Sequence, residues 1–450
     1  MRLRIYKRKV LALLLALGAA ACALALWGGA GAGAGEAAGE EPAGPAVGGS
    51  SSSSGGSPGS PARQAGNASW GPPLAAAAAE GGGNETLRLR SLVYRLNFDQ
   101  PVRHEALWTG RALGAGEAPV ALVVQVHERA EHLRLLLASL RRAPGAEKVL
   151  LVLSHDVWAP ELNALAAAVD FCAVLQIFFP FSRQLYPAEF PGSDPRDCPR
   201  DLGQAEALRR GCLNARYPDA FGHYREAAFA QTKHHWWWKL HFAWERIRAL
   251  RRHPGLLLFL EEDHYLAPDF YAVLQRLWAL RQRDCPDCQL LSLGSYAAVR
   301  GGFAQRADKA ELKSWKSTEH NMGMAFARDT YEQLLACTDA FCAYDDYNWD
   351  WTLQHLTVHC LPRFWKVLVP EIPRVFHTGD CGMHHKKACR PAAQSAKIDA
   401  LLDANRQHLF PEAMSVSKRY SLAPVSPHVK NGGWGDIRDH ELCKSYRRLQ

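Results

Sequence analysis

Between residues 120 and 293, short apolar runs of strand length alternate with longer segments that have the period of a helix. The apolar runs are Val120–Val126, Lys148–Leu153, Val174–Phe179, Leu256–Leu260 and Leu290–Leu293. Leu133–Leu140 and Pro268–Arg283 have helical spacing between them. This alternation predicts an α/β fold in which a mostly parallel, Rossmann-like sheet is flanked by helices and joined by right-handed crossovers.

Three of these strands end in polar residues: Gln125–Arg129, Ser154–Asp156 and Glu261–His264. In parallel α/β sheets, ligands bind beyond the carboxyl ends of the strands, so we expect the functional site there. Glu261, Glu262 and Asp263 repel one another unless a cation compensates them, and a hard divalent ion would do so and also bind a diphosphate. A solvated turn, or a cap for the next helix, is the alternative.

A second acidic group lies at Tyr344–Trp351, where carboxylates alternate with Tyr and Trp. On a helix, Asp346 and Asp350 would share one face. A carboxyl group beside apolar rings has a raised pKa and can accept the proton of a hydroxyl group. The alternative is a helix N-terminus, where acidic side chains offset the helix dipole.

Other polar residues are open to several interpretations. His377 follows the predicted strand Phe364–Val369, and a lone histidine is more often structural than a ligand. Trp236–Trp238 is expected to pack, with at most two of the three rings facing one core. The residues just before it, Gln231–His234, are polar enough to line a nucleotide pocket. Met383–Lys387 is read as a basic loop over an anionic ligand.

The N-terminus predicts a membrane anchor. Five basic residues precede the uncharged apolar run Val10–Trp27, which predicts a cytoplasmic tail at 1–9 and an uncleaved span at 10–27. A cleaved signal peptide is the alternative. The Gly-, Ala-, Ser- and Pro-rich residues 28–88 predict a flexible luminal stem, and 89–450 a luminal catalytic domain. Asn67 and Asn84 begin glycosylation sequons.

Charge and cysteine content agree with a luminal domain. Five of the eight net positive charges lie in the predicted tail, which leaves no nucleic-acid signature. Of twelve cysteines, Cys22 falls in the predicted span, so an oxidising lumen would pair ten and leave one free. Local spacing favours the pairs Cys198–Cys212, Cys285–Cys288 and Cys381–Cys389, with Cys172 as the free thiol.

Long stretches of the sequence resemble the N-acetylglucosaminyltransferase II family. The stretches that carry this resemblance are Phe190–Asp201, Gln231–Leu240, Leu260–Phe270, Trp315–Gly323, Asp345–Leu353 and Lys444–Gln450. The resemblance implies a GT-A fold, with a nucleotide-sugar half at about 118–300 and an acceptor half at about 301–450. It further implies that Mn²⁺ and UDP-N-acetylglucosamine (UDP-GlcNAc) are used to add N-acetylglucosamine in β1,2 linkage to the α1,6-arm mannose of an N-glycan. That addition commits the glycan to the complex type, and a Golgi membrane location and a possible homodimer are also implied.

The same resemblance assigns roles to individual residues. Asp350 would be the catalytic base, and Asp263 and His377 would ligate the metal. The UDP-sugar would be held by Gln125, Val126, His127, Glu128, Arg129, Asp156, Gln231, Thr232, Lys233, His234, His235 and Arg300. Glu128 stands where the family has Asn, and the loop Val299–Ala307 differs in length. A transferase for another mannose position, a luminal glycosidase and a lectin are the alternatives to test.

Overall fold

The computed structural model describes residues 82–296, 302–379, 390–426 and 430–448, all of which fall within the compact unit Ser69–Gln450. The predicted tail, anchor and most of the stem lie outside these residues, as do Asn67, Arg300, the basic loop at 383–387 and the pair Cys381–Cys389. Within the described ranges, no helix is both long enough and apolar enough to cross a bilayer.

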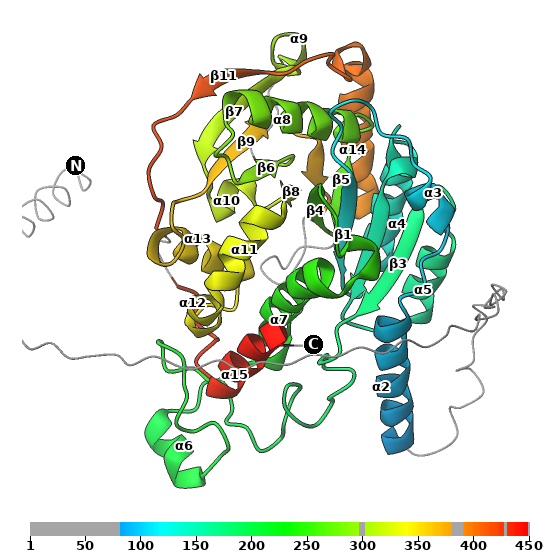
Figure 1. The fold of residues 1–450 in the computed structure, drawn as a ribbon. Coiled ribbons are helices and arrows are strands. Elements are labelled where there is room, and N and C mark those ends of the chain that lie inside the picture. The colour runs from blue at the N-terminus through cyan, green and yellow to red at the C-terminus, as the bar shows by residue number, and fades with distance from the viewer. Residues whose placement is uncertain (1–81, 297–301, 380–389, 427–429, 449–450) are drawn as a thin grey trace, which may run out of the picture. The chain divides into compact units, whose positions relative to one another are not determined.

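A nine-stranded sheet forms the centre of the fold, in the order β11-β7-β9-β6-β8-β4-β1-β2-β3 (Figure 1). Its strands are β1 Val120–Val126, β2 Leu150–His155, β3 Ala173–Phe178, β4 Leu256–Glu261, β6 Leu290–Ser292, β7 Lys309–Ser314, β8 Met324–Phe326, β9 Lys366–Pro370 and β11 Ser415–Arg419. Strands β4, β1, β2 and β3 are all parallel, whereas β8 is antiparallel to both its neighbours. The predicted α/β class and mostly parallel sheet are confirmed.

Both faces of the sheet are covered, which is why its strands are apolar at nearly every position. Val120, Leu122 and Val124 of β1 face one core, with helices α4 (Ala130–Arg141), α5 (Pro160–Ala167) and α8 (Phe270–Asp284). Ala121 and Val123 face the other core. That second core includes helices α7 (Ala227–His241), α11 (Arg328–Ala336), α12 (Thr338–Ala343) and α13 (Trp349–His359).

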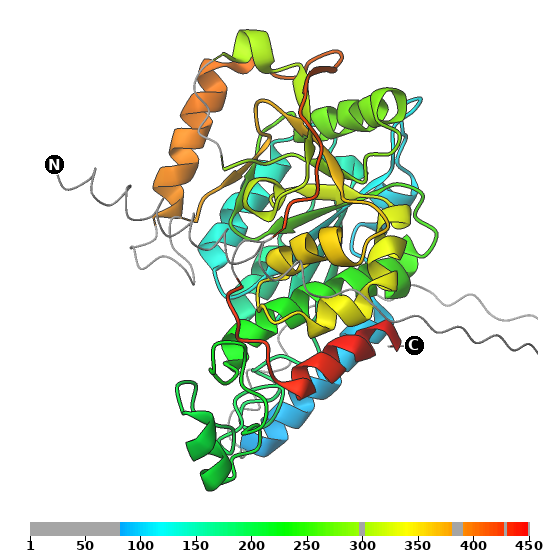
Figure 2. The ribbon, with the colours of Figure 1, turned by 90° about the vertical axis from the view of Figure 1, so that its left-hand side faces the viewer.

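Helix α7 is buried all round over its second half. Each residue from Lys233 to His241 is buried, and Trp236, Trp237 and Trp238 all belong to the same core. The expected packing role is confirmed, but the limit of two rings in one core is wrong. The reason is that α13 and α15 (Ile437–Ser445) cover the side of α7 that faces away from the sheet (Figure 1 and Figure 2).

Smaller elements complete the domain. Strands β5 (His264–Leu266) and β10 (Val375–His377) form an antiparallel pair beside the main sheet. The remaining helices of four residues or more are α2 (Gly82–Asp99), α3 (Glu105–Thr109), α6 (Gln204–Arg210), α9 (Phe303–Arg306), α10 (Ser317–His320) and α14 (Pro391–Ala404), with a π-helical turn at Phe242–Arg246. Helix α2 runs across the predicted boundary between stem and catalytic domain at residue 88.

Four disulfides lie within the described residues. Cys198–Cys212 and Cys285–Cys288 are confirmed, and Cys172 is buried and unpaired as predicted. The other two, Cys337–Cys360 and Cys342–Cys443, were not predicted. Cys342–Cys443 joins α12 to α15 across 101 residues of sequence, so it ties the C-terminal helix to the second core.

Candidate active site

The polar ends of β4, β1 and β2 meet at one edge of the sheet, as the sequence predicts. In the parallel register, Gln125 lies opposite Ser154 on one side and Glu261 on the other. This edge therefore carries the acidic residues after β4 and the polar residues after β1 and β2.

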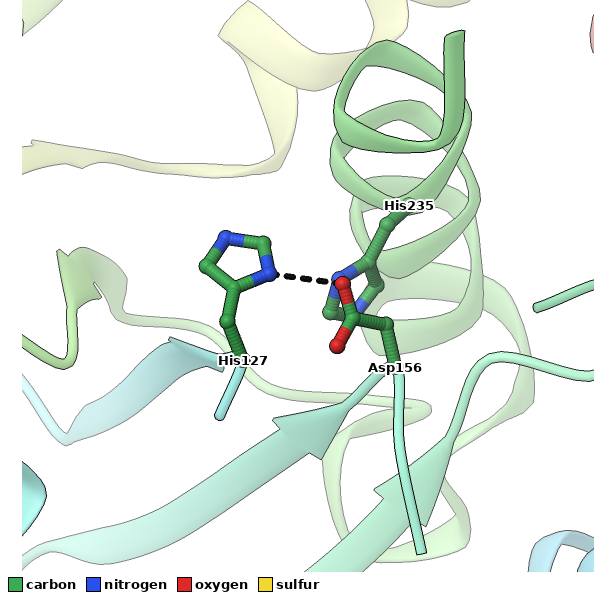
Figure 3. Close-up of side chains that lie close together, drawn as sticks. All are labelled: His127, Asp156 and His235. Atoms are coloured by element: carbon green, nitrogen blue, oxygen red, sulfur yellow. Dashed lines mark hydrogen bonds and ion pairs between the residues drawn. The ribbon is translucent and has the colours of Figure 1, made fainter. Parts of the chain in front are cut away.

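His127, Asp156 and His235 form a tight group at the end of β2 (Figure 3). His127 Nδ1 lies 2.6 Å from Asp156 Oδ2, and His235 Nδ1 lies 3.7 Å from the same oxygen. Burial disfavours the charged forms of His127 and Asp156, but the attraction between the two charges and their hydrogen bond together outweigh it. The pKa of His127 is therefore raised to about 9 and that of Asp156 is lowered. Burial instead lowers the pKa of His235 to about 4. The group is an ion pair with a neutral histidine beside it.

Only part of the predicted α7 segment reaches this group. Gln231 donates its amide N–H to Asp156 Oδ2 at 2.9 Å, and His235 lies one turn further on. Lys233 and His234 are buried elsewhere: Lys233 donates to backbone carbonyls at 344 and 346, while His234 contacts Asp439 and Tyr446.

The other predicted nucleotide residues differ in exposure. Val126 is part of the core, Thr232 is partly exposed and Glu128 is exposed. Gln125 is buried, and its Oε1 accepts a 2.7 Å hydrogen bond from Lys239 Nζ. Burial lowers the pKa of this lysine to about 7. Lys239 was not predicted as a site residue, because its sequence neighbours are tryptophan and leucine.

The acidic strand end is not a solvated turn, since Glu262 and Asp263 are both buried. Glu262 accepts hydrogen bonds from the His127 backbone N–H (2.8 Å) and from Arg129 Nε (2.6 Å). Arg129 also donates to Asp263 Oδ2 at 2.9 Å. The second oxygen of Asp263, Oδ1, is buried and has no hydrogen-bond partner among the described residues.

His377 is brought to Asp263 by the pairing of β10 with β5, in which His377 lies opposite His264. The His377 Nε2 atom is 3.2 Å from Asp263 Oδ2, and Thr378 donates two hydrogen bonds to the Asp263 carbonyl. A side chain at position 379 would place Cβ 2.8 Å from Asp263 Oδ2, so glycine leaves this carboxylate accessible.

A divalent cation fits this pair, because the His377 imidazole lies beside a buried carboxylate whose other oxygen, Asp263 Oδ1, has no hydrogen-bond partner among the described residues. The His127, Asp156 and His235 group could also hold a metal, since its ligand atoms lie within 4.8 Å of one another. However, Asp156 Oδ2 already accepts from His127 and Gln231, so an ion there would have to displace them. We therefore consider Asp263 and His377 the better metal ligands.

Asp350 lies in the first turn of α13, which begins at Trp349. Its Oδ2 accepts from Asn321 Nδ2 at 2.9 Å and its Oδ1 from the Trp351 N–H at 2.9 Å. Burial, with a smaller contribution from the charge of Glu261, raises the pKa of this carboxyl group to about 6. Asp346 precedes the helix, so the predicted shared face of Asp346 and Asp350 is wrong.

Asp350 and the acidic strand end belong to one site. The phenol of Tyr296, whose residue is 53% exposed, links them, because the charges of Glu261, Asp350 and Asp263 all act on it. Tyr296 and His377 also lie with their ring centroids 6.1 Å apart. A proton acceptor and a candidate metal pair thus lie within electrostatic range of each other.

Comparison with known proteins decides the family. The model of N-acetylglucosaminyltransferase II (MGAT2) matches residues 90–443, which is most of the chain. The chain belongs to the N-acetylglucosaminyltransferase II family.

The relatives support this assignment over the full sequence. The chain is 59% identical to a Sus scrofa protein named alpha-1,6-mannosyl-glycoprotein 2-beta-N-acetylglucosaminyltransferase, with 100% of both chains covered. It is 63% identical to the Mus musculus protein of that name over 82% of each chain. The solved structure of S. aureus TarS 1–349 aligns with 64% of this chain and 66% of that one, with a TM-score of 0.29 and 11% identity.

Two cavities of this N-acetylglucosaminyltransferase II family member lie away from the site. Their volumes are about 380 and 350 Å³, and both are bordered by Pro144 and Phe410. None of the predicted site residues lines them. Sequence reasoning missed three site residues, Tyr296, Asn321 and Lys239. It also did not predict that Glu261 would lie near the base Asp350. Glu261, Asn321 and Lys239 lie in stretches that carried the family resemblance, whereas Tyr296 does not.

Proposed function

We propose that this chain transfers N-acetylglucosamine from UDP-GlcNAc to the 2-hydroxyl of the α1,6-arm mannose of an N-glycan, with inversion at the anomeric carbon. The family assignment and the names of its close relatives support the substrate and the linkage. We also propose that the α/β domain is of the GT-A type, with the nucleotide at the β1, β2 and β4 edge.

One observation carries the chemistry: the carboxyl group of Asp350 has a pKa raised to about 6 and lies beside the acidic strand end. An inverting transfer needs a single base. Asp350 takes the proton of the mannose 2-hydroxyl while that oxygen forms a bond to the anomeric carbon. The bond between the anomeric carbon and the diphosphate oxygen breaks, and UDP leaves with the electron pair.

Asn321 orients this base through its hydrogen bond to Asp350 Oδ2, and among the described residues Oδ1 accepts only from the Trp351 N–H. On the donor side, Asp263 and His377 would hold Mn²⁺. When bound there, the ion supplies positive charge that stabilises the departing diphosphate. Arg129, which contacts Glu262 and Asp263, adds a fixed positive charge at the same place.

The nucleotide itself would lie against His127, Asp156 and Gln231. Asp156 Oδ2 accepts from His127 Nδ1 and from Gln231 Nε2, and the second N–H of the Gln231 amide remains to donate to a carbonyl oxygen of uracil. Glu128, Thr232 and His235 border the group, whereas a role for Arg300 rests on the family resemblance.

We further propose a Golgi membrane address with a single span at 10–27, a luminal domain and a possible homodimer. The disulfides within the described residues fit an oxidising lumen.

The test is to incubate the purified full-length chain with UDP-GlcNAc, Mn²⁺ and a branched N-glycan that already carries N-acetylglucosamine on its α1,3 arm. We expect one new β1,2 linkage, on the α1,6-arm mannose, by linkage mapping. A product on another mannose would favour a related transferase, and glycan cleavage without UDP a glycosidase. Glycan binding with no turnover would favour a lectin.

A further inference from the structure

Lys233 of α7 is fully buried, and its ammonium group bridges two parts of the molecule. The Nζ atom donates to the backbone carbonyls of Tyr344 (2.9 Å) and Asp346 (2.8 Å). It also lies 4.4 Å from the ring centroid of Trp434. His235, two residues along the helix, points to the opposite side, toward Asp156. The ammonium group of Lys233 is therefore directed away from the proposed nucleotide site.

The segment that Lys233 holds leads directly into α13. The Asp346 carboxylate accepts hydrogen bonds from the Asn348 N–H (2.9 Å) and from the Asn431 N–H (3.0 Å). Thr352 of α13 donates its hydroxyl to the Asn348 carbonyl at 2.9 Å. The start of α13 is thus fixed by α7 from one side and from the other by residues 430–436, the C-terminal loop that precedes α15.

Asp350 is the second residue of α13, so its place depends on where this helix begins. Its carboxylate is held by Asn321 and by the Trp351 N–H, and it has no direct contact with Lys233 in the described structure. A displacement of a reacting group by about 1 Å can cost about 100-fold in rate. A loosened helix start should therefore slow the chemistry and leave nucleotide binding unchanged.

We propose that Lys233 and Asp346 are positioning residues for the base Asp350, and that Lys233 does not bind the nucleotide. This inference rests on the proposed function for its rate readout. In this proposal, the contacts that join α7 to the segment before α13, and that segment to the C-terminal loop, set the position of the Asp350 carboxylate.

The first test is Lys233→Met in the full-length chain. Methionine keeps the apolar stem of the side chain but cannot donate to the two carbonyls. We expect kcat per UDP-binding site to fall about 10- to 100-fold. The Kd of UDP in Mn²⁺ should stay within about threefold of wild type, because no group near Asp156 or Asp263 has changed. Counting UDP-binding sites corrects for misfolded protein.

Asp346→Asn provides a second test, which decides alone if Lys233→Met does not bind UDP. Whichever way its amide is turned, its N–H₂ would face the backbone N–H of either Asn431 or Asn348, a donor-to-donor contact that should loosen the start of α13. As for Lys233→Met, we expect kcat to fall while the Kd of UDP stays nearly unchanged. Hydrogen exchange at Thr352, whose N–H bonds to the Asn348 carbonyl, should also become faster.

Lys239→Met is the matched control, because Lys239 is a buried lysine on the same helix. Its Nζ donates to Gln125 Oε1, at the end of β1. The control should weaken UDP binding, in contrast to Lys233→Met.

For each of these two variants that still binds UDP, any pattern other than a fall in kcat of at least tenfold with nearly unchanged Kd overturns the proposal. If the wild-type chain shows no turnover, the proposed function fails instead. The faster exchange at Thr352 then decides whether Lys233 and Asp346 hold α13.

Discussion

Replacing Asp350 by asparagine should abolish transfer and make the folded protein more stable at neutral pH. Asn321 supports this expectation, because within the described ranges its Oδ1 is buried without a partner while its Nδ2 donates to Asp350. If the Asn321 amide turns over, it can accept a hydrogen bond from an asparagine at position 350. The substitution therefore removes a charge without removing that hydrogen bond.

The magnitude follows from the raised pKa of Asp350. Burial is its main cause and moves the pKa from an ordinary value of 3.8 to about 6. Because one pKa unit corresponds to about 1.36 kcal/mol, the ionised side chain costs the folded state about 3 kcal/mol. Part of the side chain reaches solvent, which reduces this cost, so we expect Asp350→Asn to raise the free energy of unfolding by about 1–2 kcal/mol at pH 7.5.

The stability difference between the Asp350→Asn variant and the wild type should depend on pH. A carboxyl group whose folded pKa is raised favours the folded state below its unfolded pKa, and this contribution is lost as pH rises through about 6. The advantage of asparagine should therefore be largest above pH 6. At pH 4.5 it should be about a third as large.

The assay is urea denaturation followed by tryptophan fluorescence, with disulfides intact, at pH 4.5 and 7.5. Asp201→Asn is the control, because that side chain is 74% exposed and should change stability by less than about 0.5 kcal/mol. A less stable Asp350→Asn protein at pH 7.5, or an equal difference at both pH values, would refute the reasoning. So would turnover within tenfold of wild type.

Three further outcomes are expected. Because Asp350 must be ionised to accept a proton, kcat/KM should fall as pH drops below about 6, about tenfold per pH unit; a flat profile from pH 7 to 5 would contradict this. Asp263→Asn should weaken UDP binding in Mn²⁺ but leave metal-free UDP binding unchanged, as calorimetry can measure, and an unaltered affinity in Mn²⁺ would remove the metal role. Replacing Cys342 and Cys443 together by serine should lower the free energy of unfolding by about 2–5 kcal/mol, because the bond closes a loop of 101 residues. An unchanged urea midpoint would argue against this last expectation.

Local pattern was sufficient for the sheet and its polar edge. The run Val120–Val126 matches β1 at both ends, because a strand buried on two faces is apolar throughout and stops where polar residues begin. Parallel strands place their carboxyl ends together, so Gln125 and Glu261 could be predicted to meet. The disulfides Cys198–Cys212 and Cys285–Cys288 could also be predicted, because few residues separate the two cysteines of each pair.

The local sequence pattern failed to predict residues whose burial or secondary structure depends on contact with a distant segment of the chain. The tryptophans of α7 are all buried because α13 and α15 cover the side that a two-layer fold would expose. Asp346 is outside α13 because its carboxylate binds Asn431, which is 85 residues away.

The sequence by itself determined the family, the α/β order of strands and helices, and the acidic and histidine residues available for chemistry, since these depend on neighbours along the chain. Only the tertiary structure decided that His377 lies 3.2 Å from Asp263 and that Asp350 has Glu261 as an electrostatic neighbour. It also decided that Lys233 supports α13. The physical reason is that charge and hydrogen-bond contacts act over a few ångströms of space, and the β5–β10 pairing and the C-terminal loop set those distances.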